Sequence, residues 1–360
     1  MFPIARRSTT VSPRKTVSRA VKALWLAFFC AIPLTGAVYA QSPTNIFDPA
    51  GTPARSIFSL SMLVLSVTGV IFAIVGGLLL YALLRFRQRP TDSDREPAQI
   101  YGSNQIELAW TVIPILIVIM LFLTTTRVIL GTEHIPKPAD AIDVTVIGHQ
   151  FWWEYRYPKY GVVTANELHV PVSDPAHPLP TYLEMTSADT DHSFWVPRLA
   201  GKMDLIPNRI NTMWIDPDKA GLYLGQCGQY CGVEHAKMLL RVYAQSPADF
   251  EKWIEQQKKP ANPDFNGNPT AAEGQTVFMH SACINCHTVA GTAATGRFGP
   301  DLTHLESRDT IAAGSIPNTP ENLRKWVDDP NSMKPGALMP SMHLSQHDLD
   351  AITAYLPTLQ

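Results

Sequence analysis

Two uncharged apolar runs in the first half of the chain limit how it can fold. No charged residue lies between Ile57 and Leu84, or between Leu108 and Thr126. Segments of this length cross the roughly 30 Å hydrocarbon core of a membrane as helices, because a helix satisfies its own backbone hydrogen bonds there. Three arginines between residues 85 and 89 favour a cytoplasmic connection between the runs. We predict a transmembrane two-helix hairpin, with helices over 57–84 and 108–127 and a cytoplasmic loop over 85–107.

The first 40 residues have the pattern of a secretory signal. Six basic residues precede an apolar run over 23–38, and small residues follow it where a signal peptidase would cleave, after Ala40. Pro33 and Gly36 interrupt the run, which disfavours an additional transmembrane helix. We predict a signal peptide over 1–40 and an external segment over 41–56.

Beyond residue 140 the pattern changes to short apolar runs broken by proline and glycine. These runs recur through 140–250, which is typical of an all-β sandwich or barrel. A polar segment rich in proline, asparagine and lysine follows, and we assign 251–269 as a linker. Its most polar part, from Gln256 to Pro269, is about fourteen residues and spans at most about 45 Å, so the part that follows stays close to the β domain.

The last part of the chain, residues 270–360, has apolar residues at helical spacing. The spacing predicts helices over 271–279, 321–327 and 345–356, hence an all-α domain. Ser345, with Asp348 three positions later, favours an N-terminal cap for the last helix. The net charge of −2 and the absence of a basic run in the sequence argue against a nucleic-acid partner.

One cysteine pair lies in the predicted α domain, within Cys283-Ile284-Asn285-Cys286-His287. Two thiols at this spacing each reach one vinyl group of a porphyrin, and the imidazole that follows reaches the iron. A zinc site would need two further ligands at matching spacing, and a redox-active cysteine pair would not require the histidine. The motif therefore favours a covalently bound haem c with His287 as an axial ligand.

A second pair, Cys227 and Cys231, lies in the predicted β domain, with His235 and Met238 close behind. Thiolate, imidazole and thioether ligands together select copper among the first-row metals. A mononuclear blue-copper site uses one cysteine, so a second cysteine points to two thiolates that bridge a pair of copper ions. A disulfide and a structural zinc site stay open as alternatives on these residues alone.

From about residue 57 to 250 the chain resembles subunit II of cytochrome c oxidase, with the motifs in the family's order. The resemblance implies a cupredoxin-like Greek-key domain that holds a dinuclear copper A centre. It adds a distant histidine, which matches His192 in the segment from Asp191 to Pro197. The implied copper ligands are His192, Cys227, the main-chain carbonyl of Gln229, Cys231, His235 and Met238.

Residues 270–360 resemble the class I cytochromes c. In that family a proline carbonyl orients the axial histidine, a role that falls here on Pro300 in Gly299-Pro300-Asp301-Leu302. The second axial ligand is a methionine ahead of the final helix. The candidates are Met333, Met339 and Met342, and Met339 is our choice because a proline follows it as in the family, with Met342 in reserve.

Two positions depart from the subunit II pattern. Gln229 stands where the family usually has an acidic residue that helps bind magnesium at the interface with subunit I, so magnesium stays open. Phe151 stands where the family often has the tryptophan through which soluble cytochrome c delivers electrons. Phe151, Trp152 and Trp153 are candidates for the point where electrons enter, or they are packing residues. The departure fits a subunit that receives electrons from its own haem domain.

Glu107, at the start of the second apolar run, resembles the acidic residue at the cytoplasmic mouth of the proton path called the K channel. The alternative is a solvated charge at the N-terminus of a helix, where an acidic residue suits the helix dipole.

Together these resemblances imply subunit II of a proton-pumping, caa-type cytochrome c oxidase in a bacterial inner membrane. The haem c would accept electrons from a cytochrome c or a membrane-bound donor, and the copper centre would pass them to haem a and copper B in subunit I, with subunit III as a further partner. The alternatives are an electron-transfer subunit of another terminal reductase, of the nitric or nitrous oxide type, and a copper-delivery protein. Quinol oxidase subunits share the fold but lack the copper cysteines.

Overall fold

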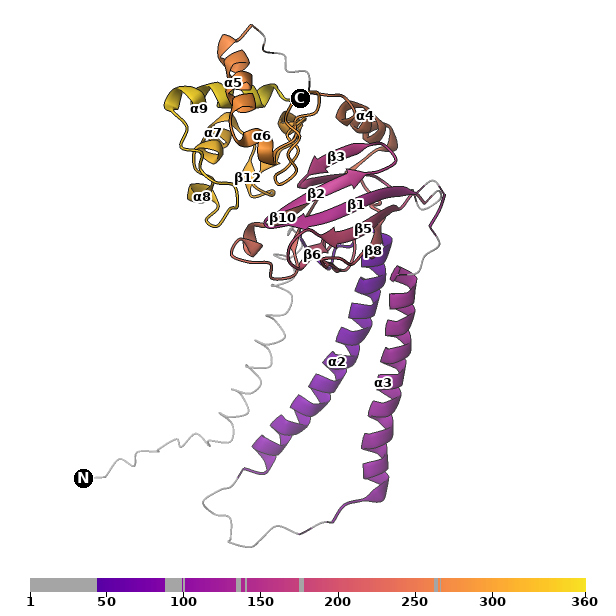
Figure 1. Cartoon of the computed structure of the whole chain (residues 1–360). Coiled ribbons are helices and arrows are strands. Elements are labelled where there is room, and N and C mark those ends of the chain that lie inside the picture. The colour runs from indigo at the N-terminus through magenta and orange to yellow at the C-terminus, as the bar shows by residue number, and fades with distance from the viewer. Residues whose placement is uncertain are drawn as a thin grey trace, which may run out of the picture.

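The computed structural model describes residues 44–87, 99, 101–133, 137–139, 141–174, 178–261, 265 and 267–360. The predicted signal peptide lies outside the described residues, as does most of the predicted cytoplasmic loop. Helices α2 (Thr52–Arg85) and α3 (Asn104–Glu133) run side by side below the β domain (Figure 1). Both are long and apolar enough to cross a membrane, and the tested span of each is unburied within the chain. Each helix extends past the predicted uncharged run at both ends, because the polar residues that flank each run are also helical.

The outer ends of both helices are fastened to the β domain. The main-chain N–H of Thr52 donates to Oδ1 of Asp216 at 2.7 Å, and Arg55 forms an ion pair with Asp218 at 2.6 Å. At the other helix, the indole N–H of Trp214 donates to the carbonyl oxygen of Thr132 at 2.7 Å. The β domain is therefore attached directly to the membrane-spanning pair.

The β domain is a sandwich of two five-stranded sheets. One sheet has the order β3-β2-β1-β5-β8 and the other has the order β4-β10-β9-β6-β7. The chain crosses between the sheets, so that β1 pairs in parallel with β5 and β4 pairs in parallel with β10. The all-β prediction is confirmed. The strands are β1 (Ile142–His149), β2 (Trp152–Tyr157), β3 (Val162–Ala165), β4 (Glu167–Pro171), β5 (Thr181–Ser187), β6 (His192–Trp195), β7 (Met203–Leu205), β8 (Asn211–Ile215), β9 (Gly221–Cys227) and β10 (Leu239–Gln245).

Helix α4 (Pro247–Gln257) occupies the first part of the segment that we predicted to be a linker. Its N-cap is Ser246, whose side chain accepts a hydrogen bond from the main-chain N–H of Asp249. Phe250 and Ile254, one helical turn apart, are buried in the core of the β sandwich. The linker prediction over 251–269 is therefore wrong for 251–257, where Ile254 is buried and Trp253 packs against the same core.

The α domain contains the three predicted helices. These are α5 (Pro269–His280), α7 (Pro320–Asp328) and α9 (Gln346–Tyr355). Ser345 accepts a hydrogen bond from the main-chain N–H of Asp348 at 3.1 Å, which confirms the predicted cap of α9. Helices α5 and α9 pack closely, because a Cβ added at Gly274 would lie 1.9 Å from the carbonyl oxygen of Ala351. The smaller elements are α6 (Cys283–Cys286), η2 (Leu305–Ser307), β11 (Thr310–Ile311), β12 (Ile316–Pro317), α8 (Pro330–Met333) and η3 (Leu356–Thr358).

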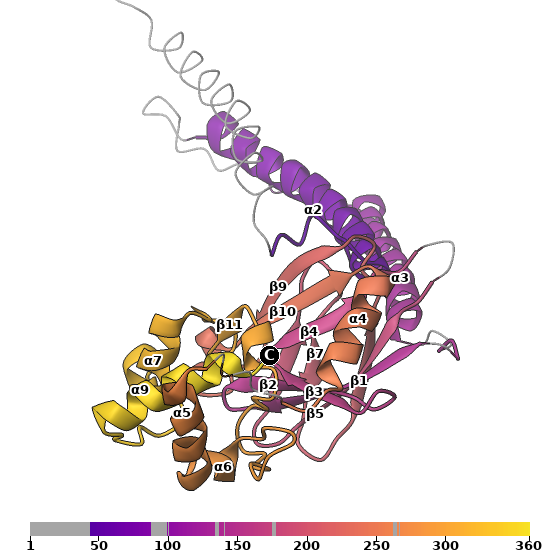
Figure 2. The ribbon, with the colours of Figure 1, turned by 90° about the horizontal axis from the view of Figure 1, so that it is seen from above.

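The α domain is docked on the β domain, on the side away from the membrane helices (Figures 1 and 2). Glu167 of β4 is buried in this contact, and its Oε1 accepts from the main-chain N–H of Thr310 at 2.9 Å. The hydroxyl of Tyr243 donates to Oδ2 of Asp309 at 2.6 Å. Direct hydrogen bonds thus join the two domains, in addition to the linker.

Candidate metal centres

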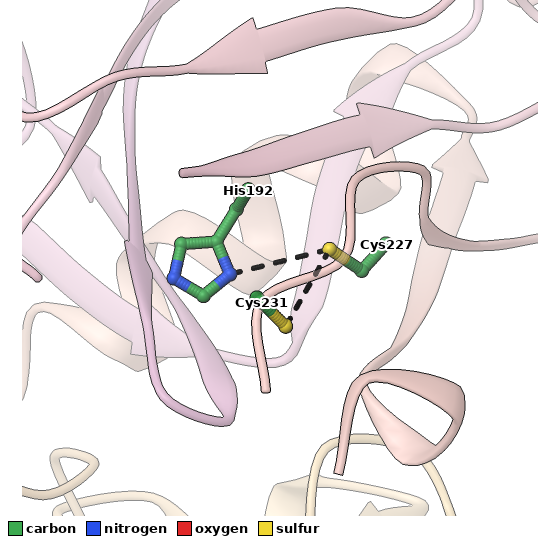
Figure 3. Close-up of side chains that lie close together, drawn as sticks. All are labelled: His192, Cys227 and Cys231. Atoms are coloured by element: carbon green, nitrogen blue, oxygen red, sulfur yellow. Dashed lines mark hydrogen bonds between the residues drawn. The ribbon is translucent and has the colours of Figure 1, made fainter. Parts of the chain in front are cut away.

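Three of the predicted copper ligands, His192, Cys227 and Cys231, lie close together in the β domain (Figure 3). Cys227 ends strand β9, and the chain returns through Cys231 and the short helix η1 (His235–Lys237) to Met238, which precedes β10. His192, the first residue of β6, reaches the same place because β6 pairs with β9. A β-hairpin loop and a neighbouring strand therefore bring together residues 46 positions apart in the chain.

The distances within this cluster form a continuous chain of contacts. Sγ of Cys227 lies 4.0 Å from Nδ1 of His192 and 3.9 Å from Sγ of Cys231. Sγ of Cys231 lies 3.8 Å from Nδ1 of His235 and 3.8 Å from Sδ of Met238. The main-chain oxygen of Gln229 lies 3.1 Å from Sγ of Cys227. All six atoms of the ligand set implied by the resemblance are assembled here.

The chemistry of this donor set fits two copper ions better than the alternatives. Both cysteines are free thiols and are buried. A tetrahedral zinc site uses four ligands, whereas this cluster has three side chains and a carbonyl around two central sulfurs, six ligand atoms in all. A thioether such as that of Met238 is a soft ligand that suits copper. Two bridging thiolates with four further ligand atoms would satisfy a pair of ions.

Electrostatics favour a thiolate at Cys227, whereas the neighbouring Cys227 sulfur raises the pKa of Cys231. The pKa of the Cys227 thiol is lowered, first because the adjacent Cys231 thiol stabilises its anion, an effect that outweighs burial, and then because His192 does the same. Burial alone would lower the pKa of His192, but its contacts with Asp189 and Cys227 raise that pKa overall. Copper binding would release the protons of these side chains, because metal ligands must be deprotonated.

Two residues that the sequence did not predict, Asp189 and Gln150, form hydrogen bonds with candidate ligand residues. Oδ1 of Asp189 lies 2.8 Å from Nε2 of His192, which leaves Nδ1 to face the sulfurs. A carboxylate that holds the far nitrogen of a metal-binding histidine fixes both the tautomer and the ring orientation. The side-chain amide of Gln150 donates to the carbonyl oxygen of Cys231 at 2.6 Å. The one sequence signal was the position of Asp189, three residues before His192. An aspartate at this spacing from a histidine is common in proteins where it has no such role.

The aromatic candidates for the point where electrons enter are all buried. Trp153 is fully buried, and its ring meets the imidazole of His192 edge-on at a centroid distance of 6.0 Å. Trp152 stacks on His149 at 4.2 Å. The ring of Phe151 packs against Gly232 in the copper loop. These rings do not form a surface for an external protein carrier, so any role in electron transfer would be through the interior.

The predicted haem-attachment motif forms helix α6 and the turn after it. Nδ1 of His287 donates to the carbonyl oxygen of Pro300 at 2.8 Å, as the resemblance implied. Burial lowers the pKa of His287, which keeps its imidazole neutral and Nε2 free for an iron. A Cβ added at Gly299 would lie 2.6 Å from Cε1 of His287, so the loop packs directly on the ring. Free, half-buried thiols at Cys283 and Cys286 complete a donor set that fits a haem c.

The methionine candidates lie between α7 and the end of the loop before α9. Met333 ends α8, while Met339 and Met342 are half-buried in the loop that follows. Met339 as the second iron ligand stays a prediction, with Met342 in reserve.

Glu107 lies in the first turn of α3. Its side chain is exposed and folds back toward Gly102, and the hydroxyl of Thr111 donates to its main-chain oxygen at 2.8 Å. This position suits both a proton-path residue and a charge at a helix N-terminus.

Three family descriptions match successive parts of the chain. The cytochrome c oxidase subunit II transmembrane domain matches residues 40–128, its periplasmic domain matches 177–245, and cytochrome c matches 271–360. Cytochrome c oxidase subunit 2 of Alkalihalophilus pseudofirmus is 33% identical over 96% of this chain and 98% of its own length. The corresponding protein of Bacillus sp. (strain PS3) is 33% identical over 88% of this chain and 91% of its own. The solved periplasmic domain of cytochrome oxidase subunit II from Bradyrhizobium japonicum is 28% identical, with a TM-score of 0.32, over 34% of this chain and 97% of that domain.

Proposed function

We propose an electron-relay function for this chain, which belongs to the cytochrome c oxidase subunit II family. It relays electrons from a covalent haem c, through a dinuclear copper centre, into an oxygen-reducing oxidase. Its place in that family makes it a subunit of an oxidoreductase. The haem c and the copper pair, when bound, would each take up and release one electron at a time.

The convergence of His192, Cys227, Cys231, His235 and Met238 carries this proposal. These residues come from β6, the end of β9 and the loop before β10, yet their ligand atoms form one buried cluster. The rigid sandwich beneath them holds the ligands in place, and Asp189 orients His192. Such support keeps the ligand geometry nearly constant when the charge of the metal changes.

The haem domain has a matching arrangement. Pro300 holds His287 by its Nδ1, and the side chains of Cys283 and Cys286 lie on the preceding turn of helix. Met339 would provide the second iron ligand. The residues of this chain therefore supply attachment and orientation, and bond breaking in oxygen belongs to the partner.

The two long apolar helices support the proposed membrane partners. The apolar side chains of α2 and α3 are exposed in the described chain, which suits contact with lipid and with subunit I, the carrier of haem a and copper B. Subunit III and a cytochrome c or membrane-bound donor complete the proposal, in a bacterial inner membrane with both metal domains on the periplasmic side. Glu107 would lie at the cytoplasmic mouth of a proton path. Gln229 offers no carboxylate, so magnesium is not part of the proposal.

A copper-delivery role fits the cluster less well. A protein that hands over copper needs a site from which the ion can be taken, whereas Cys227 and Cys231 are 2% and 3% exposed. The deep burial of both sulfurs favours a permanent centre.

The decisive experiment is purification of the membrane complex that contains this chain, followed by metal, haem and oxygen-consumption measurements. We expect two coppers and one haem c on this subunit, haem a in the complex, and oxygen uptake that is lost in Cys231→Ser together with the copper of this subunit. A single zinc, a disulfide between Cys227 and Cys231, or a complex without haem a would overturn the proposal in favour of the rival functions.

A further inference from the structure

Lys334 of the haem domain is buried in the contact with the β domain. The residue is 3% exposed. Its Nζ donates to the carbonyl oxygens of Phe151 at 3.0 Å, Lys237 at 3.0 Å and Ala312 at 3.3 Å. An ammonium group has three N–H donors and needs a partner for each when it leaves water. The three carbonyls meet that need, so this lysine is built into the interface.

Both carbonyls on the β domain belong to segments that adjoin the copper ligands. Lys237 directly precedes Met238 in the chain. Phe151 directly follows Gln150, whose side-chain amide donates to the carbonyl oxygen of Cys231. The ammonium therefore ties together two segments that surround the copper cluster, and it does so from another domain.

The haem domain holds the backbone on both sides of Met238. The carbonyl oxygen of Lys237 accepts a second hydrogen bond from Oγ of Ser315 at 2.8 Å. On the other side, the main-chain N–H of Leu239 donates to the carbonyl oxygen of Ala313 at 3.1 Å. The two peptide groups that flank Met238 are thus hydrogen-bonded to the haem domain.

The segment that carries Lys334 also leads to the haem. Gly336 packs on the copper loop, since a Cβ added there would lie 2.3 Å from Cγ2 of Val233, and its φ of +96° favours glycine. Three residues further along is Met339, the proposed iron ligand. One short segment therefore contacts the copper loop and continues to the haem ligand.

We propose that Lys334 is a positioning residue for electron transfer between the two centres, which it serves by pinning the loop that leads to Met339 against the backbone around Met238. This inference rests on the proposed relay function. In this arrangement the haem domain does not swing on its linker but is held in a single docked position.

A second polar contact between the domains provides a matched comparison. Glu167 accepts from the main-chain N–H groups of Asp309 and Thr310 and from the Thr310 hydroxyl. These contacts do not involve the peptide groups around Met238, so loss of the Glu167 carboxylate should loosen docking without altering those groups directly. If Lys334 only held the two domains together, Lys334→Met and Glu167→Gln would have the same effects on the copper spectra and on electron transfer.

The test uses the whole oxidase complex with Lys334→Met, and with Lys325→Met as a control on an exposed lysine of α7. We expect Lys334→Met to keep its copper and haem, to slow electron transfer from haem c to copper by about tenfold, and to speed amide exchange at Leu239. The absorption and electron paramagnetic spectra of the copper centre should shift in Lys334→Met and stay unchanged in Glu167→Gln. If Lys334→Met does not assemble, Ser315→Ala, which removes the second bond to the same carbonyl, should give a smaller slowing of the same kind.

The results separate this inference from the relay itself. The positioning role would be overturned, and the relay left intact, if Lys334→Met had wild-type transfer rates, Leu239 exchange and copper spectra. The same results in Ser315→Ala would overturn it when Lys334→Met does not assemble. Identical spectral shifts in Lys334→Met and Glu167→Gln would also overturn it, because docking alone would then explain them. Absence of copper from the wild-type subunit would instead refute the proposed function.

Discussion

Oδ1 of Asp189 lies 2.8 Å from Nε2 of His192, on the opposite side of the imidazole from the copper-site sulfurs. This carboxylate also accepts from the main-chain N–H groups of Gln150 and Thr190, so it is itself held in place. Burial would raise the pKa of Asp189, but these contacts, that of His192 foremost, lower it overall. The pair therefore presents a fixed imidazole with Nδ1 directed at Cys227.

We expect Asp189→Asn to weaken copper binding by about 10- to 100-fold, because it removes the charge that fixes the tautomer and orientation of His192. Copper competition against a chelator of known affinity measures this directly. Asp191→Asn, on an exposed carboxylate two positions away, is the matched control and should bind like the wild type. Equal copper affinities for the two variants would show that the contact has no supporting role.

Helix packing in the haem domain depends on Gly274. Alanine at this position would place its Cβ 1.9 Å from the carbonyl oxygen of Ala351, an atom of the α9 backbone that cannot move aside alone. We expect Gly274→Ala to lower the free energy of unfolding by about 1–3 kcal/mol, as overpacking does in a well-packed core. Thermal denaturation followed at the haem absorption checks this. Glu273→Ala, on the exposed neighbouring position, should change stability by less than about 0.5 kcal/mol.

His169 makes the stability of the β domain depend on pH. Its ring lies between Trp253 and Tyr243, at centroid distances of 4.2 and 4.9 Å, and burial lowers its pKa from 6.5 to about 4. Between these values the unfolded chain binds a proton that the folded chain does not, so stability falls as the pH falls from 6.5 toward 4. The full loss is on the order of 3 kcal/mol.

Urea denaturation of the subunit at pH 7 and pH 5, followed by circular dichroism, measures this contribution. His169→Phe keeps a ring between Trp253 and Tyr243 and removes the titrating group. We expect this variant to be less stable at pH 7, since Gln245 loses its partner, and to show a smaller drop at pH 5. A drop as large as that of the wild type would assign the pH dependence to other groups.

Local patterns in the sequence were enough for much of the fold and for most of the candidate metal ligands, although His192 came only from the family resemblance. The helical spacing located α5, α7 and α9, and the loop from Cys227 to Met238 contains most of the proposed copper ligands within twelve residues. Long-range contacts were not accessible in this way. The bond from Lys334 to Phe151 joins residues 183 positions apart, and nothing near Lys334 distinguishes it from a solvated lysine. Helix α4 was missed because its apolar residues are few among polar neighbours, and its contacts are with strands far away in the sequence.

The choice between Met339 and Met342 can be decided by two matched variants. Both side chains are half-buried in the same loop, so replacement of either by leucine keeps its size and removes only the thioether. We expect Met339→Leu to lose the absorption band of sulfur-ligated ferric haem and to lower the reduction potential of the haem, because a thioether ligand raises that potential. Met342→Leu should keep both properties. The reverse pattern would assign Met342 to the iron, and would place the ligand eight residues from Lys334 instead of five, which would lengthen the segment that the docked lysine holds.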